Sequence, residues 1–518
     1  MNTKYIKFIG IIGLIFNSVH ATTIELTIDD FIKESIKRNS NVIMDRLQGE
    51  IVDNKVKYEE DIFVPQFYSK FNYQKTDVPT NIEDSLTRGN DDPYQDRIRN
   101  IEMGFTGLLN TGGVWKTSFS NNKKTSSLIL NEPGIDYDNE YTNVFEVSLT
   151  QPLLKGAGKE VTLAKYSNAL ADKEINNKEY EKLILDLSLT VVQTYWKFYG
   201  IKELKNSYIE SIKLNKQSIQ TLENRVTSGD APVSEVLEAK SNLMIKEAEL
   251  KRIESDFIQI KSNIFNLLNV HENENKDIVF KLMDKPINIE NIDNTPESLF
   301  DKALVNWPEY KIAKAKLKKE SINYDITKNS LLPQLDLSAS IFNTDLKDHQ
   351  NNDFDTSNFV SGSFGLDFKM PITSSQSQKA LEIARLKKLK VDIEINTLEK
   401  RLYNAISAKL TSYLNAKEQV QFYKKSLELR EQILKDKEIS FNLGDINIKE
   451  VFEQINFIID YKRKLFSSII EWKMAEASLQ KTTGELLAND LNIEKLKSYQ
   501  GERYDNSLNN TDFGVLND

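Results

Sequence analysis

Residues 225–235 read RVTSGDAPVSE and residues 440–450 read SFNLGDINIKE, each in the middle of a long segment with helical periodicity. Both stretches carry a Gly-Asp pair, formed by Gly229 and Asp230 in the first and by Gly444 and Asp445 in the second. Glycine adopts the left-handed conformation that ends a helix, and aspartate favours the turn that follows. We therefore expect each pair to form the tip of an antiparallel helical hairpin.

The residues that follow the first tip support a second helix. Pro232 suits the first turn of that helix, and Glu235 places a negative charge near its N-terminus. An incidental glycine kink is the alternative interpretation, but it does not predict acidic residues at matched offsets in both copies.

Apolar residues step by three and four on both sides of the tips, which is typical of a coiled-coil seam. Lys409 and Lys462 interrupt this pattern in the second copy. The two longest segments, roughly 160–228 and 376–442, each reach on the order of 100 Å at 1.5 Å per residue. Helices of that length must pack against others, and an ordinary coiled-coil rod is one way to do so.

The chain is an internal repeat. The two tip glycines are 215 residues apart (444 − 229), and Pro152 and Pro371, which each end a strand-like stretch before a long helix, are 219 apart (371 − 152). The first predicted repeat covers 22–269, with strands at about 65–150 and a helical hairpin at 157–269. The second covers 297–487, with strands at about 333–371 and a hairpin at 376–487. A waist linker over 270–296 joins the two repeats, and a polar tail follows over 488–518.

The strand-like stretches alternate apolar and polar residues, which indicates a sheet with one apolar face. The runs are about 9–11 residues long, the length of a tilted strand that crosses a bilayer. A soluble sandwich with the apolar face inward is the alternative. In a barrel the polar face would line the lumen, and the predicted lining residues are Gln334, Asp336, Ser338, Asp367, Lys369, Glu146 and Ser148. An extra hairpin around LNTGG would raise the count from four strands per chain to six, and the sequence leaves both counts open.

The N-terminus predicts export. Lys4 and Lys7 precede an apolar run from Phe8 to Phe16 and a small-residue cleavage site at Ala21, so residues 1–21 are typical of a signal peptide. A membrane anchor is the alternative, but the run is too short to span a bilayer. No later run reaches the length of a transmembrane helix, and an exported chain without one can still span a membrane as a closed barrel.

Composition excludes several classes of function. The formal net charge of −9 argues against nucleic-acid binding. With no cysteine in the sequence we expect no disulfide, no thiol chemistry and no N-terminal lipid anchor. The mature chain has His271 and His349 only, both in polar contexts, and no catalytic, metal or cofactor motif, so we expect a protein without enzymatic activity or cofactors.

At this point the sequence resembles the TolC-type outer-membrane factors, the outer membrane efflux protein family. The resemblance covers about 24–488 and is carried, in family order and twice over, by LTIDDFIKESIKRNSNV, VPQF, VSLTQPLLKGAG, RVTSGDAPVSEVLEAKSNL, NWPEYKIAKAKL, LLPQLDL, DFKMPI and FNLGDINIKEVFEQ. It implies a mainly helical chain with membrane strands, in which three copies build one outer-membrane β-barrel continued by a long periplasmic helical barrel. It also implies outer-membrane lipid, a periplasmic adaptor and an inner-membrane transporter as partners.

The resemblance further assigns roles to residues at the tips. Glu450 and Glu453 match the family's gate acids, with Glu235 as the corresponding acid of the first repeat, and a solvated helix face is the alternative. The tips, including Gly229, Asp230, Gly444 and Asp445, match the surface where an adaptor docks. Some members lock the gate with an aromatic hydroxyl and a basic residue, where this chain has Phe441 and Ile446. The implied function is a passive exit duct for efflux or type I secretion, and a coiled-coil adhesin is the rival.

Overall fold

The computed structural model describes residues 23–79, 81–82, 85–86, 93–126, 139–270, 278–286, 295–347, 360–372 and 375–486. The predicted signal peptide at 1–21, His271, His349 and the predicted tail at 488–518 lie outside these residues. The chain divides into two compact units. The strand unit comprises 50–175 and 313–394, and the helical unit comprises the described residues of 1–49, 176–312 and 395–518.

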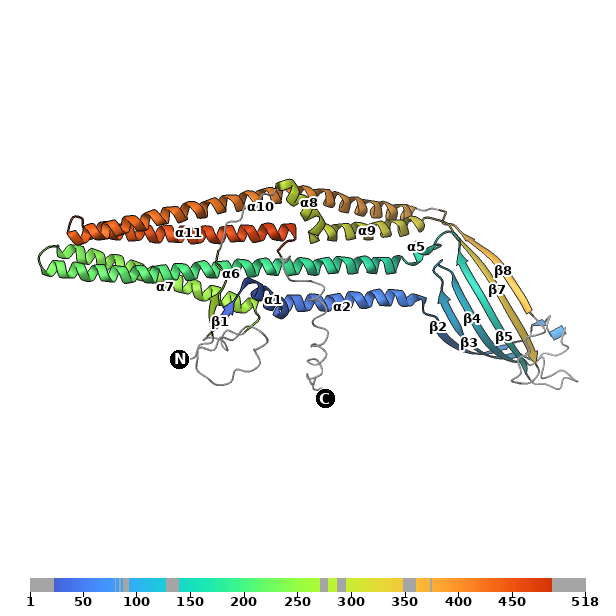
Figure 1. Ribbon diagram of the computed structural model, residues 1–518. Helices are drawn as coiled ribbons and strands as arrows, with labels where there is room; N and C mark the ends of the chain where they lie inside the picture. Colours follow the sequence, from blue (N-terminus) through green and yellow to red (C-terminus); the bar gives the residue numbers. More distant parts are fainter. Residues whose placement is uncertain are drawn as a thin grey trace, which may run out of the picture. The chain divides into compact units, whose positions relative to one another are not determined.

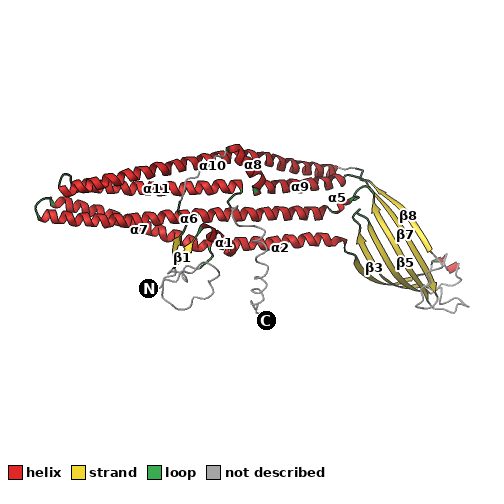
Figure 2. Cartoon of the chain, viewed as in Figure 1, coloured by secondary structure: helices red, strands yellow, loops and turns green. Residues whose placement is uncertain are grey.

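The strand unit contains one antiparallel sheet of six strands within the described residues, drawn as yellow arrows in Figure 2. Its order is β2-β3-β4-β5-β7-β8, so the extra hairpin β3–β4 joins the sheet and β5 of the first repeat pairs with β7 of the second. The strands are β2 (Gln66–Val78), β3 (Tyr94–Leu108), β4 (Val114–Ser126), β5 (Glu140–Pro152), β7 (Gln334–Lys347) and β8 (Val360–Lys369).

The register separates two faces of this sheet. One row of directly paired positions runs through Phe67, Phe105, Thr117, Val147 and Ile341. Four of these five side chains are large and apolar, and they are exposed in the single chain, with Phe67 at 63% and Ile341 at 65%. Because successive side chains of a strand point to opposite faces, the neighbouring positions form a polar face. The predicted alternation therefore describes the sheet correctly.

Four helices contribute residues to both units: α2 (Ser40–Glu60), α6 (Ala164–Thr227), α9 (Pro308–Asn329) and α10 (Ser375–Leu443). The strand unit also contains the short helix α5 (Lys159–Thr162) and the 3-10 turn η1 (Asp61–Phe63). Within the strand unit, ion pairs join these helices. Lys319 of α9 lies 2.6 Å from Asp172 of α6, and Lys173 of α6 lies 2.9 Å from Asp53 of α2.

The helical unit is completed by α1 (Ile28–Arg38), α7 (Val233–Leu267), α8 (Pro296–Asn306) and α11 (Ile448–Thr483), labelled in Figure 1. Its largest buried cluster packs Phe31 of α1 against Ile184, Val191 and Tyr195 of α6. A short parallel pair of strands, β1 (Thr23–Leu26) and β6 (Val279–Leu282), lies on this cluster, and the Tyr195 hydroxyl donates to the Leu26 carbonyl at 3.2 Å. Strand β6 falls in the segment expected to be a waist linker, 270–296.

Local structure confirms the two-repeat pattern. Thr27 and Thr295 are both N-caps whose side chains accept from the backbone N–H three residues on, and each begins an 11-residue helix. At the far ends of α7 and α11, Asn269 and Gly484 both adopt positive φ. These two positions are 215 residues apart (484 − 269), the same separation as the two tip glycines. The duplication therefore extends over the whole of each helical hairpin.

No helix of the described residues is long and apolar enough to cross a membrane.

Candidate functional site: the hairpin tips and the polar sheet face

Both tips end their first helix in the same way. Gly229 has φ 82° and Gly444 has φ 88°. In each copy the glycine N–H bonds to the carbonyl three residues back and the aspartate N–H bonds to the carbonyl five residues back, at 3.1 and 2.8 Å in the first copy and 3.0 and 2.9 Å in the second. This pair of bonds is the Schellman motif, which satisfies the free carbonyls at a helix C-terminus. The predicted antiparallel hairpins, α6–α7 and α10–α11, follow directly.

A buried apolar cluster lies beneath the tips and joins the two hairpins. It contains Leu222 of α6, Val236 of α7, Phe441 of α10 and Val451 of α11, each at most 6% exposed. The Arg225 guanidinium lies 5.0 Å from the centre of the Phe441 ring. Phe441 and Ile446, at the positions where some family members carry a polar lock, therefore belong to this apolar packing.

The predicted gate acids lie in different surroundings. Glu450 pairs with Lys437 of α10, with 3.3 Å between Oε2 and Nζ, and its backbone N–H is capped by the Asn447 side chain. Glu453, one turn further along α11, is exposed. Glu235 lies in the first turn of α7 and is half-buried. The structure therefore places the acids near the tips, but a basic residue compensates Glu450.

A lysine that interrupts the apolar heptad pattern of the sequence links the two hairpins. Lys462 of α11 lies 3.5 Å from Glu210 of α6 and 3.9 Å from Glu431 of α10. A cation at an apolar heptad position is the sequence signal that marks such a contact. The Lys462 side chain is only 21% exposed, but Glu210 and Glu431 are 66% and 48% exposed, so solvent screens much of both ion pairs.

All seven predicted lining residues lie on the polar face of the sheet. The register pairs Asp336 with Asp367, Gln334 with Lys369, and Ser338 with Gly365 on strands β7 and β8. Glu146 and Ser148 of β5 belong to the same face, since Ser148 pairs with Ser340. The structure thus brings residues of both repeats onto one polar surface.

Sequence reasoning missed a charged cluster on this face. The Tyr68 hydroxyl and the Lys116 ammonium both donate to Oε1 of Glu102, each at 2.8 Å. The Lys116 and Lys70 ammonium groups also lie 5.4 and 5.3 Å from the centre of the Tyr68 ring. Tyr68 of β2 lies on the polar face although it is aromatic, because its hydroxyl finds a hydrogen-bond acceptor there. The apolar ring concealed this role in the sequence.

The described residues contain no group of three or more His, Cys, Asp or Glu side chains arranged to hold a metal ion.

A single chain of this kind, with a sheet that exposes an apolar face and two helical hairpins, has the fold of outer-membrane channels. The chain matches VceC from Vibrio cholerae with a TM-score of 0.60 and 14% identity, over 88% of this chain and 96% of that one. It matches the MtrE outer membrane channel of Neisseria gonorrhoeae with a TM-score of 0.62 and 13% identity, over 89% of each chain. It matches the CmeC channel of Campylobacter jejuni with a TM-score of 0.57 and 13% identity, over 91% and 88%.

A family model described as outer membrane efflux protein matches residues 299–485. This match confirms the resemblance to the outer membrane efflux protein family that the sequence indicates. No curated protein sequence matches the chain.

Proposed function

We propose that the protein is a passive exit duct of the outer membrane, assembled from three copies of the chain. The observation that carries this proposal is the six-stranded sheet, which exposes an apolar face and gathers polar residues of both repeats on the other. Lipid against the first face and water against the second give both faces a suitable solvent. The match to the outer membrane efflux protein family supports the same role.

The edges of the sheet support assembly. Within the described residues β2 pairs with β3 alone and β8 pairs with β7 alone, so one edge of each strand is unpaired. A bilayer core has no water to satisfy such an edge, and six strands are fewer than the smallest barrel of eight. Pairing β8 of one copy with β2 of the next satisfies both edges, and three copies give 18 strands (3 × 6). Four strands per chain, without the β3–β4 hairpin, would give 12 (3 × 4), so this barrel would be wider.

The helical unit also exposes apolar surface that assembly would bury. Large apolar side chains are exposed along α10, where Phe422 is 68% exposed, and along α7, where Met244 is 69% exposed. Burying them against neighbouring copies removes this surface from water. The further apolar residues that are exposed on these helices within this unit are Leu414, Leu429, Ile433, Ile439 and Leu443 of α10 and Val233, Leu237, Ile245 and Ile258 of α7.

The helical hairpins would form a periplasmic tunnel, and their tips would contact a periplasmic adaptor joined to an inner-membrane transporter. That transporter would supply the energy, so the duct itself needs no catalytic site or cofactor. Within this role, drug or metal efflux and type I protein secretion share one exit architecture. Loss of the gene distinguishes them, because efflux predicts greater sensitivity to small toxic compounds and secretion predicts loss of an extracellular protein.

Purified protein in a planar bilayer tests the proposal. We expect a detergent-solubilised complex with three times the mass of the mature chain and stepwise ion conductance after insertion. A coiled-coil adhesin, the rival function, predicts an elongated particle without conductance. A monomer that stays in the aqueous phase would overturn the duct.

A further inference from the structure

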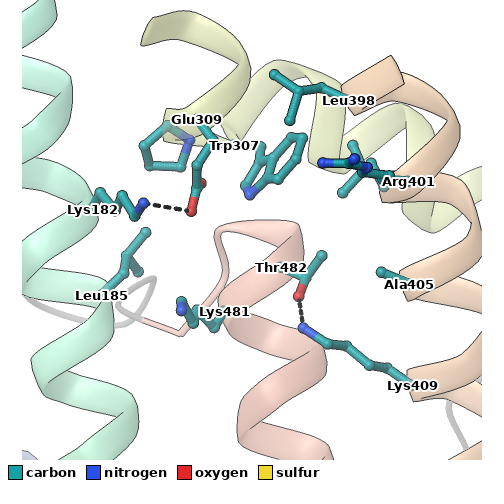
Figure 3. Close-up of a pocket in the computed structure, with 12 residues that line it drawn as sticks. Lys182, Leu185, Trp307, Glu309, Leu398, Arg401, Ala405, Lys409, Lys481 and Thr482 are labelled. Atoms are coloured by element: carbon teal, nitrogen blue, oxygen red, sulfur yellow. Dashed lines mark hydrogen bonds and ion pairs between the residues drawn. The ribbon is translucent and has the colours of Figure 1, made fainter. Parts of the chain in front are cut away.

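A cavity of about 280 Å³ lies inside the helical unit, where α11 ends and α9 begins. Figure 3 shows its walls, with Trp307, Glu309 and Lys182 on one side and Arg401, Ala405 and Lys409 of α10 on the other. The apolar part of the wall is formed by Leu185, Trp307, Pro308, Leu398, Leu402 and Ala405. Neither the duct function nor the family match assigns a role to this cavity.

The lining carries an excess of positive charge. It includes Lys182, Arg401, Lys409 and Lys481 but only one carboxylate, Glu309. Glu309 pairs with Lys182 at 3.5 Å, and Lys481 pairs with Asp186, which lies outside the lining. Two carboxylates therefore compensate two of the four cations.

The other two cations, both on α10, have no carboxylate partner in the described part of the chain. The Lys409 ammonium donates to the Ser478 carbonyl at 3.3 Å and to the Thr482 hydroxyl, which are both neutral acceptors. Among the described residues no hydrogen bond or ion pair involves the Arg401 guanidinium, which is exposed and lines the cavity.

The surroundings of Lys409 disfavour its positive charge. Burial lowers the pKa of Lys409 below its usual range, and the Lys481 ammonium lowers that pKa further, whereas Glu309 raises it. Desolvation and a like charge both disfavour the protonated form of a lysine. An anion between Lys409 and Lys481 would remove the repulsion.

The two uncompensated cations are present in the second repeat but not at the corresponding positions of the first. At the 215-residue offset of the two tips, Arg401 corresponds to Asp186 (401 − 215) and Lys409 corresponds to Thr194 (409 − 215). The first repeat thus has an acid and a neutral residue at the positions where the second repeat has its two uncompensated cations. This side of the cavity differs in charge between two otherwise similar hairpins.

We propose that this cavity binds a small organic anion, with its phosphate or carboxylate group near Lys409 and Lys481 and its apolar body against Trp307 and Leu398. The exposed Arg401 would complete the recognition of the charged group, since guanidinium groups bind phosphate and carboxylate well. The volume lies just below the roughly 300–1,000 Å³ of typical ligand pockets, so the ligand is compact. This proposal does not rest on the duct function.

Isothermal titration calorimetry on the full-length protein in detergent tests it, with phenyl phosphate and benzoate as probes at constant ionic strength. We expect saturable binding of at least one probe, with one site per chain. Inorganic phosphate and benzyl alcohol, which each lack one half of the proposed recognition, should bind at least tenfold more weakly. No saturable binding of either aromatic anion would overturn the proposal, as would inorganic phosphate binding as tightly as phenyl phosphate.

Variants assign the binding to the cavity. Arg401→Gln and Lys409→Gln should each weaken binding by about tenfold, the order expected for loss of one charge-assisted hydrogen bond. Lys400→Gln is the matched control, because Lys400 is an exposed cation next to Arg401 on the same helix and does not line the cavity. Arg401 is exposed, so its variant should fold even if the Lys409 variant does not. Equal weakening in the Lys400 and Arg401 variants would place the binding elsewhere.

Discussion

Asp336 of β7 stands directly opposite Asp367 of β8 on the polar face of the sheet. The side-chain amide of Gln334 donates to the Asp336 carboxylate at 2.5 Å. Gln334 itself stands opposite Lys369 in the strand register, two residues from the pair of aspartates. Like charges at directly opposed positions usually destabilise a sheet by a few tenths of a kcal/mol to about 1 kcal/mol. Water and cations reduce that repulsion, so this pair fits a face that borders an aqueous lumen.

We expect Asp336→Lys to lower the preference of the channel for cations over anions, because it replaces one of two adjacent acids with a base. The measurement is the reversal potential in a KCl gradient across a planar bilayer. Asp77→Lys is the control, since Asp77 of β2 lies on the opposite face by register. An unchanged reversal potential in the Asp336 variant would remove this residue from the lumen.

The two gate acids should differ in their effect on conductance. Glu450 is compensated by Lys437, whereas Glu453 is exposed and takes part in no ion pair of the described residues. Glu453→Gln should therefore change single-channel conductance more than Glu450→Gln does, and Lys437→Gln should resemble the addition of a negative charge. Recordings at low salt give the largest contrast because exposed charges are then least screened. A larger effect at Glu450 would contradict this ranking.

Replacing the tip glycines should cost backbone strain alone. A Cβ added at Gly229 or Gly444 meets no atom within 4 Å, but both residues have positive φ. Gly229→Ala and Gly444→Ala should each lower stability by about 1 kcal/mol, the usual cost of the left-handed conformation for other residues. Gly484→Ala should cost more, because its Cβ would lie 2.5 Å from Cβ of Asn306. Thermal melting followed by circular dichroism compares the three, and equal losses would be inconsistent with this distinction.

Lys246 makes the α6–α7 hairpin sensitive to pH. Its side chain is 7% exposed, its ammonium donates to the Ser211 hydroxyl at 3.1 Å, and burial lowers its pKa to about 8 from 10.5. Between these two pH values the unfolded chain binds more protons than the folded chain, so stability rises with pH from about 8 to 10.5. Below pH 8 Lys246 is charged in the folded protein, which then bears the full free-energy cost of burying that charge, on the order of 3 kcal/mol.

Lys246→Met should therefore raise the melting temperature at pH 7 by several degrees and by much less at pH 10. Replacing a buried charge by an apolar side chain of similar length removes the desolvation cost. Lys213→Met, at an exposed position of α6, is the control and should have little effect at either pH. A gain for Lys246→Met that does not depend on pH would indicate improved packing instead of a relieved charge.

Particular residues show how far the sequence predicts this fold and where prediction stops. Gly229 and Gly444 identify the hairpins because a helix end depends on the conformation of a few consecutive residues. The alternation in β7 and β8 identifies the polar face for the same local reason. The parallel pair β1–β6 was missed because each strand has four residues and the partners are 256 positions apart (279 − 23). The ion pair between Glu450 and Lys437 joins two helices and has no local signature.

The sequence by itself determined where the long helices end, which face of each strand is apolar and that the chain is duplicated. These features depend on backbone preferences and on periodicities that act over one or two turns or a few strand residues. Only the tertiary structure decided that β5 pairs with β7, that Lys246 is buried, and that Arg401 and Lys409 face a cavity with too few acids. Those outcomes depend on segments that are distant in the sequence. When these segments pack together they exclude water from some side chains and bring charges next to others.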